Sequence, residues 1–274
     1  MTSVATIILN RNLPEPTERL YEHLIEFDGA ETDIFVLEAG SDSHLLSKYC
    51  TWHADSPKIV REGLRYSRGM NYALLNLYKE RRWNAYDAFF LLTNDTELRP
   101  QPTISPLLDN LSRHRHVGIL SPCSKRWGEK LLLTDQKTRY FWFIHNHALF
   151  LRRQFVESVM ETNKPSFMNF LFDGSNFRGY LSECELIAKA YANDWAAAIT
   201  TDAYAEENET YLLDKSDLIK TEVYEENLRL YIQEGLLWMK SKYGFNSRWS
   251  MHQYVKSFYD SFFEFHPEYK MYKI

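Results

Sequence analysis

The sequence has few cysteines and no excess of positive charge. Cys50, Cys123 and Cys184 are its only cysteines, and no C-x-x-C pair is present, which favours neither a disulfide framework nor a zinc cluster and indicates a reducing, cytoplasmic location. Its 274 residues carry 32 Lys and Arg against 37 Asp and Glu, a formal net charge of −5. Because no overall field attracts a polyanion, nucleic-acid binding is not expected.

Long apolar runs, internal repeats and low-complexity linkers are also missing. No stretch approaches the apolar length of a membrane span, and the short apolar run near the N-terminus has no basic region before it and no cleavage site after it. Hydrophobic residues make up 45% of the chain and charged residues 25%. This is the composition of a globular enzyme or binding protein that can bury a sizeable core.

Apolar runs typical of buried strands alternate with segments of helical periodicity. The expected strands are 4–9, 33–37, 88–92, 117–120 and 196–201, with one or two more within 140–151, and the expected helices are 17–27, 69–80 and 183–195. This alternation predicts an α/β domain over residues 1–205, with a mostly parallel sheet flanked by helices. Ligands collect outside the carboxyl ends of the strands in such sheets.

Residues 206–274 differ in character and predict a helical, aromatic-rich extension. An acidic connection leads to a helix from about Glu225, and a later helix carries Tyr254, Phe258, Phe262 and Phe265 at helical spacing. Packing on the main domain is the expected role of this aromatic face. With Lys256, Lys270 and Lys273 nearby, it could also make a peripheral contact with a membrane.

The strand at 88–92 ends in Asn94-Asp95-Thr96-Glu97. Two carboxylates at this spacing, on a turn outside a sheet, can hold a hard divalent cation and leave coordination positions for phosphate oxygens. The alternative is an ordinary solvated turn, because Asn, Asp and Thr are common turn residues.

Two further segments could carry chemistry. Glu183 lies in the first turn of a predicted helix, where a carboxylate is either a response to the helix dipole or, if buried, a candidate general base. The loop 61–71 carries several arginines, Arg68 among them, and feeds a helix. Arginine suits phosphate contacts, although a structural role on a surface loop is the commoner one.

In their order and spacing, these segments resemble family 2 of the inverting GT-A glycosyltransferases over about residues 4–202. The most specific match is Leu-Leu-Thr-Asn-Asp-Thr-Glu-Leu at 91–98, which is similar to the family's L-L-N-N-D-T-E-L strand end with its D-x-D motif. Residues 36–42 resemble V-D-N-x-S-x-D, and residues 63–71 resemble G-x-x-x-x-R-G-x-N. Residues 180–195 align with Y-G-E-D-x-D-L-x-x-R-x-x-x-x-G-W, which puts Glu183 where the family carries its catalytic Asp.

The resemblance implies a GT-A, Rossmann-like fold and a role for each matched residue. Glu183 would be the catalytic base, and Asp95 and Glu97 would hold a divalent metal, Mn²⁺ or Mg²⁺. The residues implied to bind the nucleotide sugar are Asn10, Arg11, Glu38, Arg68, Asn94, Asp95 and Arg153. Glu38 and Glu183 each replace the family's usual Asp. Thr200, Thr201 and Asp202 occupy the neighbourhood where some GT-A enzymes add a His ligand, so no third metal ligand is identified.

The implied function is transfer of a hexose or deoxyhexose from a nucleotide-diphosphate sugar to a hydroxyl of a glycan or lipid-linked saccharide, with inversion. The C-terminal region resembles the tails of bacterial polysaccharide and O-antigen glycosyltransferases. The alternative is a non-catalytic carbohydrate- or nucleotide-binding module, or an assembly subunit, on a drifted GT-A fold, because fold alone does not establish activity. A nucleotidyltransferase is less favoured, because residues 10–14 contain no glycine for a phosphate loop.

Overall fold

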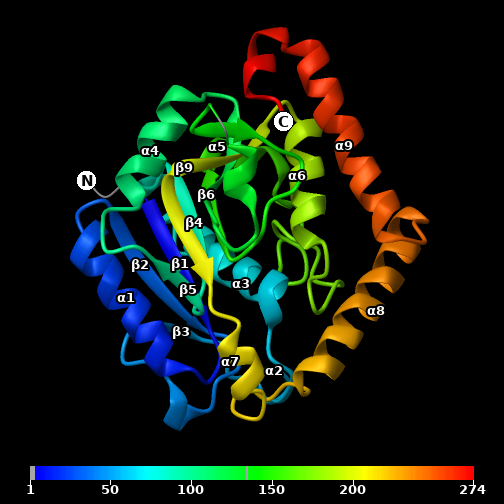
Figure 1. Cartoon of the computed structure of the whole chain (residues 1–274). Helices are drawn as coiled ribbons and strands as arrows, with labels where there is room; N and C mark the ends of the chain where they lie inside the picture. Colours follow the sequence, from blue (N-terminus) through cyan, green and yellow to red (C-terminus); the bar gives the residue numbers. More distant parts are fainter. Residues whose placement is uncertain (1–3, 134) are drawn as a thin grey trace.

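The structure is a computed structural model that describes residues 4–133 and 135–274. Its centre is a mixed sheet with the strand order β3-β2-β1-β4-β8-β6-β9-β5, and β7 pairs with β9 beside this path (Figure 1). The strands are β1 (Val4–Asn10), β2 (Thr32–Glu38), β3 (Cys50–His53), β4 (Ala88–Thr93), β5 (Thr96–Leu98), β6 (Val117–Cys123), β7 (Thr138–Tyr140), β8 (Ala148–Arg152) and β9 (Ala196–Glu207).

Parallel pairing, as expected from the sequence, dominates the first half of the sheet. β3, β2, β1 and β4 are parallel neighbours, and β6 is parallel to β9. The strand β8 enters between β4 and β6 and runs antiparallel to both, while β5 and β7 run antiparallel to β9. β1 and β4 are buried over almost their whole lengths, which fits their continuous apolar sequences because central parallel strands are covered on both faces.

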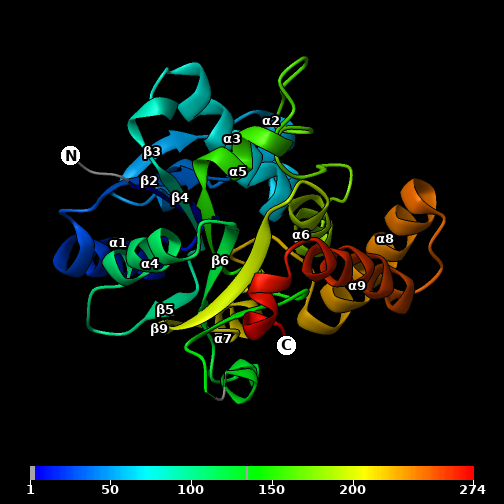
Figure 2. The ribbon, with the colours of Figure 1, turned by 90° about the horizontal axis from the view of Figure 1, so that it is seen from above.

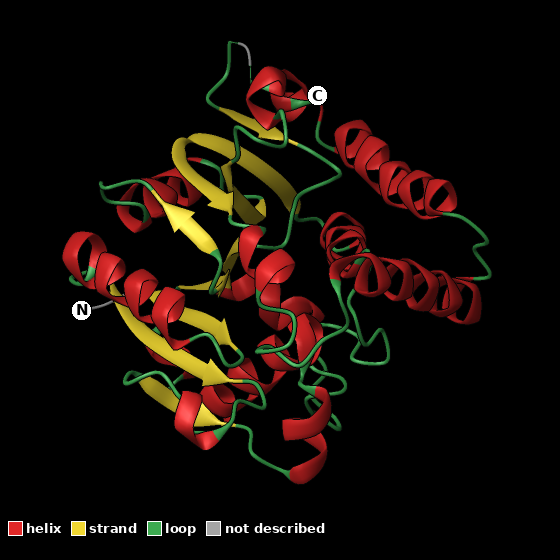
Figure 3. Ribbon diagram, turned by 60° about the horizontal axis from the view of Figure 1, so that its bottom comes forward, coloured by secondary structure: helices red, strands yellow, loops and turns green. Residues whose placement is uncertain are grey.

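Helices cover both faces of the sheet (Figures 2 and 3). α1 and α4 lie together on one face, where the Asp28 carboxylate accepts hydrogen bonds from the backbone N–H groups of Thr103 and Ile104. α3, α5 and α6 cover the other face. The helices are α1 (Pro14–Asp28), α2 (Pro57–Glu62), α3 (Arg65–Lys79), α4 (Ile104–Arg113), α5 (Arg153–Val159), α6 (Ser182–Ala192), α7 (Thr210–Asp214), α8 (Tyr224–Tyr243) and α9 (Arg248–Phe265).

The C-terminal helices α8 and α9 form a long arm along one side of the domain, and α9 packs against α6 (Figure 1). Phe262 is buried, as the aromatic spacing predicts, but Phe265 is 80% exposed. After α9, a 3₁₀ helix (Pro267–Tyr272) turns the chain back to β7, where Tyr140 and Lys273 form a β-bridge. No helix within the described residues is long and apolar enough to cross a membrane.

Several elements differ from the sequence-based expectations. β9 does not end at 201 but continues to Glu207. Of the region 140–151, where one or two strands were expected, only Tyr140 at the end of β7 and Ala148–Leu151 in β8 are in strands. α3 begins at Arg65, four residues before the expected start. β3, β5, α2 and α4 were not expected, since each is short or lacks a continuous apolar run. The α/β class and the helical C-terminal extension are as predicted.

Candidate active site

A cavity of about 220 Å³ opens at the carboxyl ends of β1, β2 and β4. Asn10 and Arg11 line it from the end of β1, and Asn94 and Asp95 from the turn after β4. The segment 208–223, which includes α7, passes over these strand ends and contributes Tyr211, Ile219 and Thr221 to the lining. The cavity therefore lies where ligands bind in open α/β sheets.

The floor of this cavity is held by a buried polar network centred on Glu38. The Glu38 carboxylate is fully buried and accepts hydrogen bonds from Asn10 Nδ2 at 2.8 Å, from the Ser41 hydroxyl and from the Ser47 backbone N–H at 2.8 Å. Asn94 Nδ2 donates to Asn10 Oδ1 at 2.8 Å. The sequence-predicted residues Asn10, Glu38 and Asn94 thus come together, with Glu38 beneath the cavity and its oxygens already occupied.

Asp95 lies at the edge of the cavity in a group of carboxylates. Its Oδ1 is buried and has no hydrogen-bond partner. Burial raises the pKa of Asp95, and the nearby Glu209 raises it further. Burial, followed by the charges of Asp95 and Glu209, raises the pKa of Glu207 to about 7. Glu207 is the last residue of β9, and the next residue, Asn208, donates its backbone N–H to the Asp95 carbonyl at 2.9 Å.

These carboxylates fit a divalent cation. A partly buried pair of like charges with an unsatisfied oxygen is costly by itself, and a bound cation would offset that cost and use oxygen ligands. Asp95 and Glu207 are the residues that would hold it. Glu97 is placed differently: it is exposed on β5, accepts a hydrogen bond from Asn208 Nδ2 at 2.7 Å, and lines an adjacent hollow that also includes Asp95.

Glu183 lies at the start of α6 and is 8% exposed. Burial raises its pKa to about 7, and its Oε2 is a buried atom without a hydrogen-bond partner. The hydroxyl of Tyr66, a residue that lines the cavity, is likewise buried and unpartnered, and the charge of Glu183 contributes to its raised pKa. A buried carboxylate with a pKa near neutrality is suited to general-base chemistry.

Tyr231 of α8 is influenced by the charges of both Glu183 and Glu207. Burial is the main reason for the raised pKa of its hydroxyl, and the charges of Glu183 and Glu207 both add to the shift. Glu183 and Glu207 therefore both lie near Tyr231. This brings the base candidate and the metal-binding candidates into one neighbourhood.

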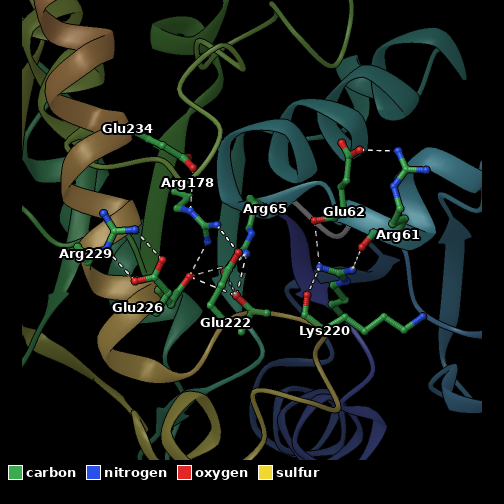
Figure 4. Close-up of polar contacts among 12 residues, drawn as sticks. Arg61, Glu62, Arg65, Arg178, Lys220, Glu222, Glu226, Arg229 and Glu234 are labelled. Carbon is green, nitrogen blue, oxygen red and sulfur yellow. Dashed lines mark hydrogen bonds and ion pairs between the residues drawn. The ribbon is translucent and has the colours of Figure 1, made fainter.

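An arginine group borders the cavity on the side of α3 (Figure 4). Arg65 lines the cavity, donates to the Thr221 hydroxyl at 2.8 Å, and lies 3.6 Å from the Glu222 carboxylate. Arg178, whose side chain is 6% exposed, pairs with Glu222 at 2.8 Å and with Glu234 at 3.1 Å. Burial and the neighbouring Arg178 lower the pKa of Arg65 to about 10. Arg65 remains a cation at neutral pH, so it can attract an anion into the cavity.

Arg11 also lines the cavity, but its guanidinium is hydrogen-bonded to backbone carbonyls. It donates to the carbonyls of Val60 at 3.2 Å, Arg61 at 3.1 Å and Glu62 at 3.1 Å, at the end of α2. It also contacts the Lys220 carbonyl. Arg11 therefore joins the loop after β1 to α2 and to the segment that covers the cavity.

Two sequence-predicted residues lie away from the cavity. Arg68 donates to the Gly174 carbonyl at 2.7 Å and lies over the Phe177 ring. Arg153 begins α5, beside Asp87 at the amino end of β4, and pairs with Glu157 at 3.1 Å. Because Asp95 follows the carboxyl end of β4, Arg153 and Asp95 lie at opposite ends of this strand.

Glu207, Arg65 and the covering segment 208–223 were not expected from the sequence. No period-two pattern of polarity leads to Glu207, because Ala203, Tyr204 and Ala205 form a continuous apolar run. The alternate burial of Ala203 and Ala205 is visible only in the structure. Arg65 belongs to the Arg-bearing loop that was identified, but the start of α3 was placed too late to select it.

The described fold is that of the GT-A glycosyltransferases. GalNAc-T7, solved with UDP, GalNAc and Mn²⁺, superposes with a TM-score of 0.57 at 9% identity, over 96% of this chain and 56% of that one. Residues 1–349 of TarS from S. aureus, in complex with UDP-GlcNAc, superpose with a TM-score of 0.54 at 12% identity, over 96% of this chain and 73% of that one. The chain thus spans little more than half the length of GalNAc-T7. The sequence matches no protein-family model and no curated protein.

Proposed function

We propose that this protein is an inverting glycosyltransferase of the family 2 type that uses a nucleotide-diphosphate sugar and a divalent metal. The observation that carries the proposal is the buried carboxylate of Glu183, whose pKa burial raises to about 7, in a GT-A fold that also brings the Asp95 and Glu207 carboxylates together at the edge of the cavity. The ligands of the similar structures, UDP with Mn²⁺ in GalNAc-T7 and UDP-GlcNAc in TarS, support a uridine nucleotide as the first donor to test.

Each residue has a role in this proposal. Glu183 accepts the proton of the acceptor hydroxyl, which attacks the anomeric carbon from the side opposite the leaving diphosphate, so that one displacement inverts the configuration. Arg65 attracts and orients the diphosphate. A divalent cation held by Asp95 and Glu207 would stabilise negative charge on the departing diphosphate when bound. Asn10, Asn94 and Glu38 fix the strand ends against which the nucleotide lies.

The acceptor in this proposal is a hydroxyl of a glycan or lipid-linked saccharide, as in bacterial polysaccharide and O-antigen synthesis. The exposed aromatic residues Trp249 (71% exposed) and Phe265 (80% exposed) on α9 support a peripheral membrane contact at the inner face of the membrane. Co-sedimentation with vesicles of phosphatidylglycerol and phosphatidylethanolamine tests this contact. W249A and F265A, at the two ends of α9, should each reduce the bound fraction, and undiminished binding by the double variant would exclude these two residues as the contact.

The first experiment is a thermal-shift panel of UDP, GDP, dTDP and CMP and their sugar conjugates, each with Mn²⁺ and with EDTA. Ligand binding raises the melting temperature by mass action. A shift with one nucleotide family that disappears in EDTA identifies the donor class. No shift with any of them would overturn the proposal.

The second experiment is turnover of that donor by E183Q, measured as release of nucleoside diphosphate with glycan acceptors. We expect E183Q to bind the donor as the wild type does and to turn over about 10²–10⁴-fold more slowly. E185Q is the control, because Glu185 lies in the same turn of α6 but pairs with Lys242 and Tyr243. Undiminished turnover by E183Q would exclude Glu183 as the base. Donor binding without turnover in the wild type would instead indicate a non-catalytic module.

A further inference from the structure

A second group of potential metal ligands lies far from the cavity. His116, Asp194 and His266 each offer a ligand atom, and these atoms all lie within 4.8 Å of one another. His116 directly precedes β6, Asp194 lies in the turn between α6 and β9, and His266 follows α9. The cluster therefore joins three separate segments, two from the sheet domain and one from the C-terminal arm.

The side chains of this cluster are already oriented toward one another. His266 Nε2 lies 2.5 Å from Asp194 Oδ1, and His266 Nδ1 lies 3.4 Å from a Glu268 oxygen. His116 Nδ1 lies 3.2 Å from the Asp194 carbonyl and 4.0 Å from its carboxylate. A carboxylate on the second nitrogen of a ligating histidine fixes the orientation of the ring, which is the arrangement found around metal-bound histidines. For His266, the Glu268 carboxylate lies next to the second ring nitrogen, Nδ1.

The backbone at Asp194 adds to this arrangement. Asp194 has φ +66°, in the left-handed region that residues other than glycine adopt infrequently. Here it tightens the turn before β9 and turns the Asp194 carboxylate toward both histidines. The two imidazole rings lie 4.8 Å apart, with Phe262 and Tyr269 packed against them. His266 is 17% exposed, His116 32% and Asp194 64%, so an ion can enter from solvent.

We propose that His116, Asp194 and His266 form a site for Zn²⁺ or a similar borderline transition metal. Two imidazoles and one carboxylate match the donor preference of zinc, and a water molecule would complete the coordination. Ligand atoms around a tetrahedral zinc ion are about 3.3 Å apart. The spacing of the cluster therefore needs only side-chain rotations to bind the ion. The Asp194 side chain is 64% exposed, so its carboxylate has room to rotate from His266 toward a bound ion.

This site is separate from the candidate active site. It lies at the amino ends of β6 and β9, whereas Asp95 and Glu207 lie at the carboxyl end of β9, so that roughly 30 Å of strand intervenes. The expected role is structural, because a bound ion would hold the end of α9 to the connections before β6 and β9. Chemistry also separates the two sites, since the oxygen-only ligands at Asp95 favour Mn²⁺ or Mg²⁺ and the imidazoles favour Zn²⁺.

The test is calorimetric titration of the EDTA-treated, dialysed full chain with ZnCl₂, together with the absorption spectrum of the Co²⁺-loaded protein. We expect one Zn²⁺ per chain at this site, and visible Co²⁺ bands of a site with nitrogen ligands. H116A and H266A should each weaken this binding by at least about tenfold and remove those bands, and E268Q should weaken it by about tenfold. D194N should also weaken it while keeping the fold, because Asn tolerates the same backbone conformation.

Two controls separate the outcomes. H44A removes an exposed histidine elsewhere and should bind Zn²⁺ as the wild type does. D95N combined with E207Q removes the carboxylates of the candidate active site and should leave the Co²⁺ spectrum unchanged. Zn²⁺ binding that is equal in wild type, D194N and H266A would overturn the proposal. A wild type whose only Zn²⁺ binding disappears in D95N/E207Q would also overturn it, because His266 and Asp194 would then be an ordinary ion pair.

Discussion

Glu207 at the end of β9 lies beside Asp95 in the turn after β4, and the charge of Asp95 contributes to raising the pKa of Glu207 to about 7. The two residues are far apart in the sequence, and the antiparallel pairing of β5 with the end of β9 brings them together. Neither strand end alone places one carboxylate beside another. The candidate metal site is therefore a product of the sheet topology.

Replacing Asp95 or Glu207 should weaken metal-dependent nucleotide binding. D95N and E207Q each remove one of the two carboxylates proposed to hold the cation, and we expect the apparent affinity for UDP in Mn²⁺ to fall by about tenfold or more. Thermal shift and calorimetry with and without EDTA measure this. E97Q is the informative comparison, because Glu97 was predicted as a ligand from the sequence but is exposed on β5. A larger loss in E97Q than in E207Q would restore Glu97 as the second ligand.

The metal-free protein should lose stability as pH rises toward 7. Burial raises the pKa of Glu183 from 4.5 to about 7, so the folded state keeps a proton that the unfolded state releases near pH 4.5. The free energy of unfolding therefore falls between about pH 4.5 and pH 7 and levels off above it. E183Q cannot ionise, so it should be more stable than the wild type at pH 8, by about 3 kcal/mol at most, and equal to it near pH 4.5. Urea denaturation in EDTA at both pH values measures the difference, and a pH-independent difference would contradict the assignment.

The parts of the site that lie on continuous apolar strands could be predicted from the sequence. Apart from Thr6, β1 and β4 are apolar up to the polar residues at their carboxyl ends, so Asn10, Asn94 and Asp95 were placed at strand ends that the parallel pairing of β1 and β4 brings together. Glu183 was predicted as the base because residues 180–195 resemble the family's motif, whereas its place in the first turn of a helix left a helix-dipole role open. For these residues, the position expected from the local sequence pattern is the position found in the fold.

The remaining parts depend on information that local pattern does not contain. Arg68 was chosen from the Arg-bearing loop, but α3 begins at Arg65, so that Arg65 lies at the cavity and Arg68 contacts Gly174. The covering segment 208–223 has no long apolar run and is held by single contacts. One of these is the hydrogen bond from Asn12 Nδ2 to the Leu218 carbonyl, at 2.7 Å. Such contacts form only once the sheet has assembled.

Breaking the Glu222 ion pairs should loosen the segment that covers the cavity. Burial would raise the pKa of Glu222, but hydrogen bonding to the Arg178 guanidinium dominates and lowers it to about 2. In E222Q, Arg178 and Arg65 lose an anionic partner, and because solvent screens the 37% exposed Glu222 side chain we expect a loss of about 1 kcal/mol in stability. Hydrogen exchange in residues 215–223 should become faster, and UDP should dissociate faster.

E226Q is the matched control for E222Q. Glu226 pairs with Arg229 on the exposed surface of α8, three residues away (Figure 4). An exposed pair of this kind contributes about 0.5 kcal/mol or less. Hydrogen exchange over 215–223 should therefore match the wild type. Equal exchange in E222Q and E226Q would show that Glu222 does not hold the covering segment in place.

A single methyl group at Gly235 should disturb the contact between α8 and the start of α6. A Cβ at this position would lie 2.4 Å from the Tyr180 Cβ, and Tyr180 is two residues before α6, which carries Glu183 in its first turn. Glycine to alanine in an exposed helix stabilises by about 1 kcal/mol. At Gly235 the clash should reverse the sign and give a loss of about 1–3 kcal/mol. S241A, at an exposed position of the same helix, should be neutral or slightly stabilising. Urea denaturation of both variants measures the difference, and a stabilised G235A would mean that α8 does not pack this closely against Tyr180 in solution.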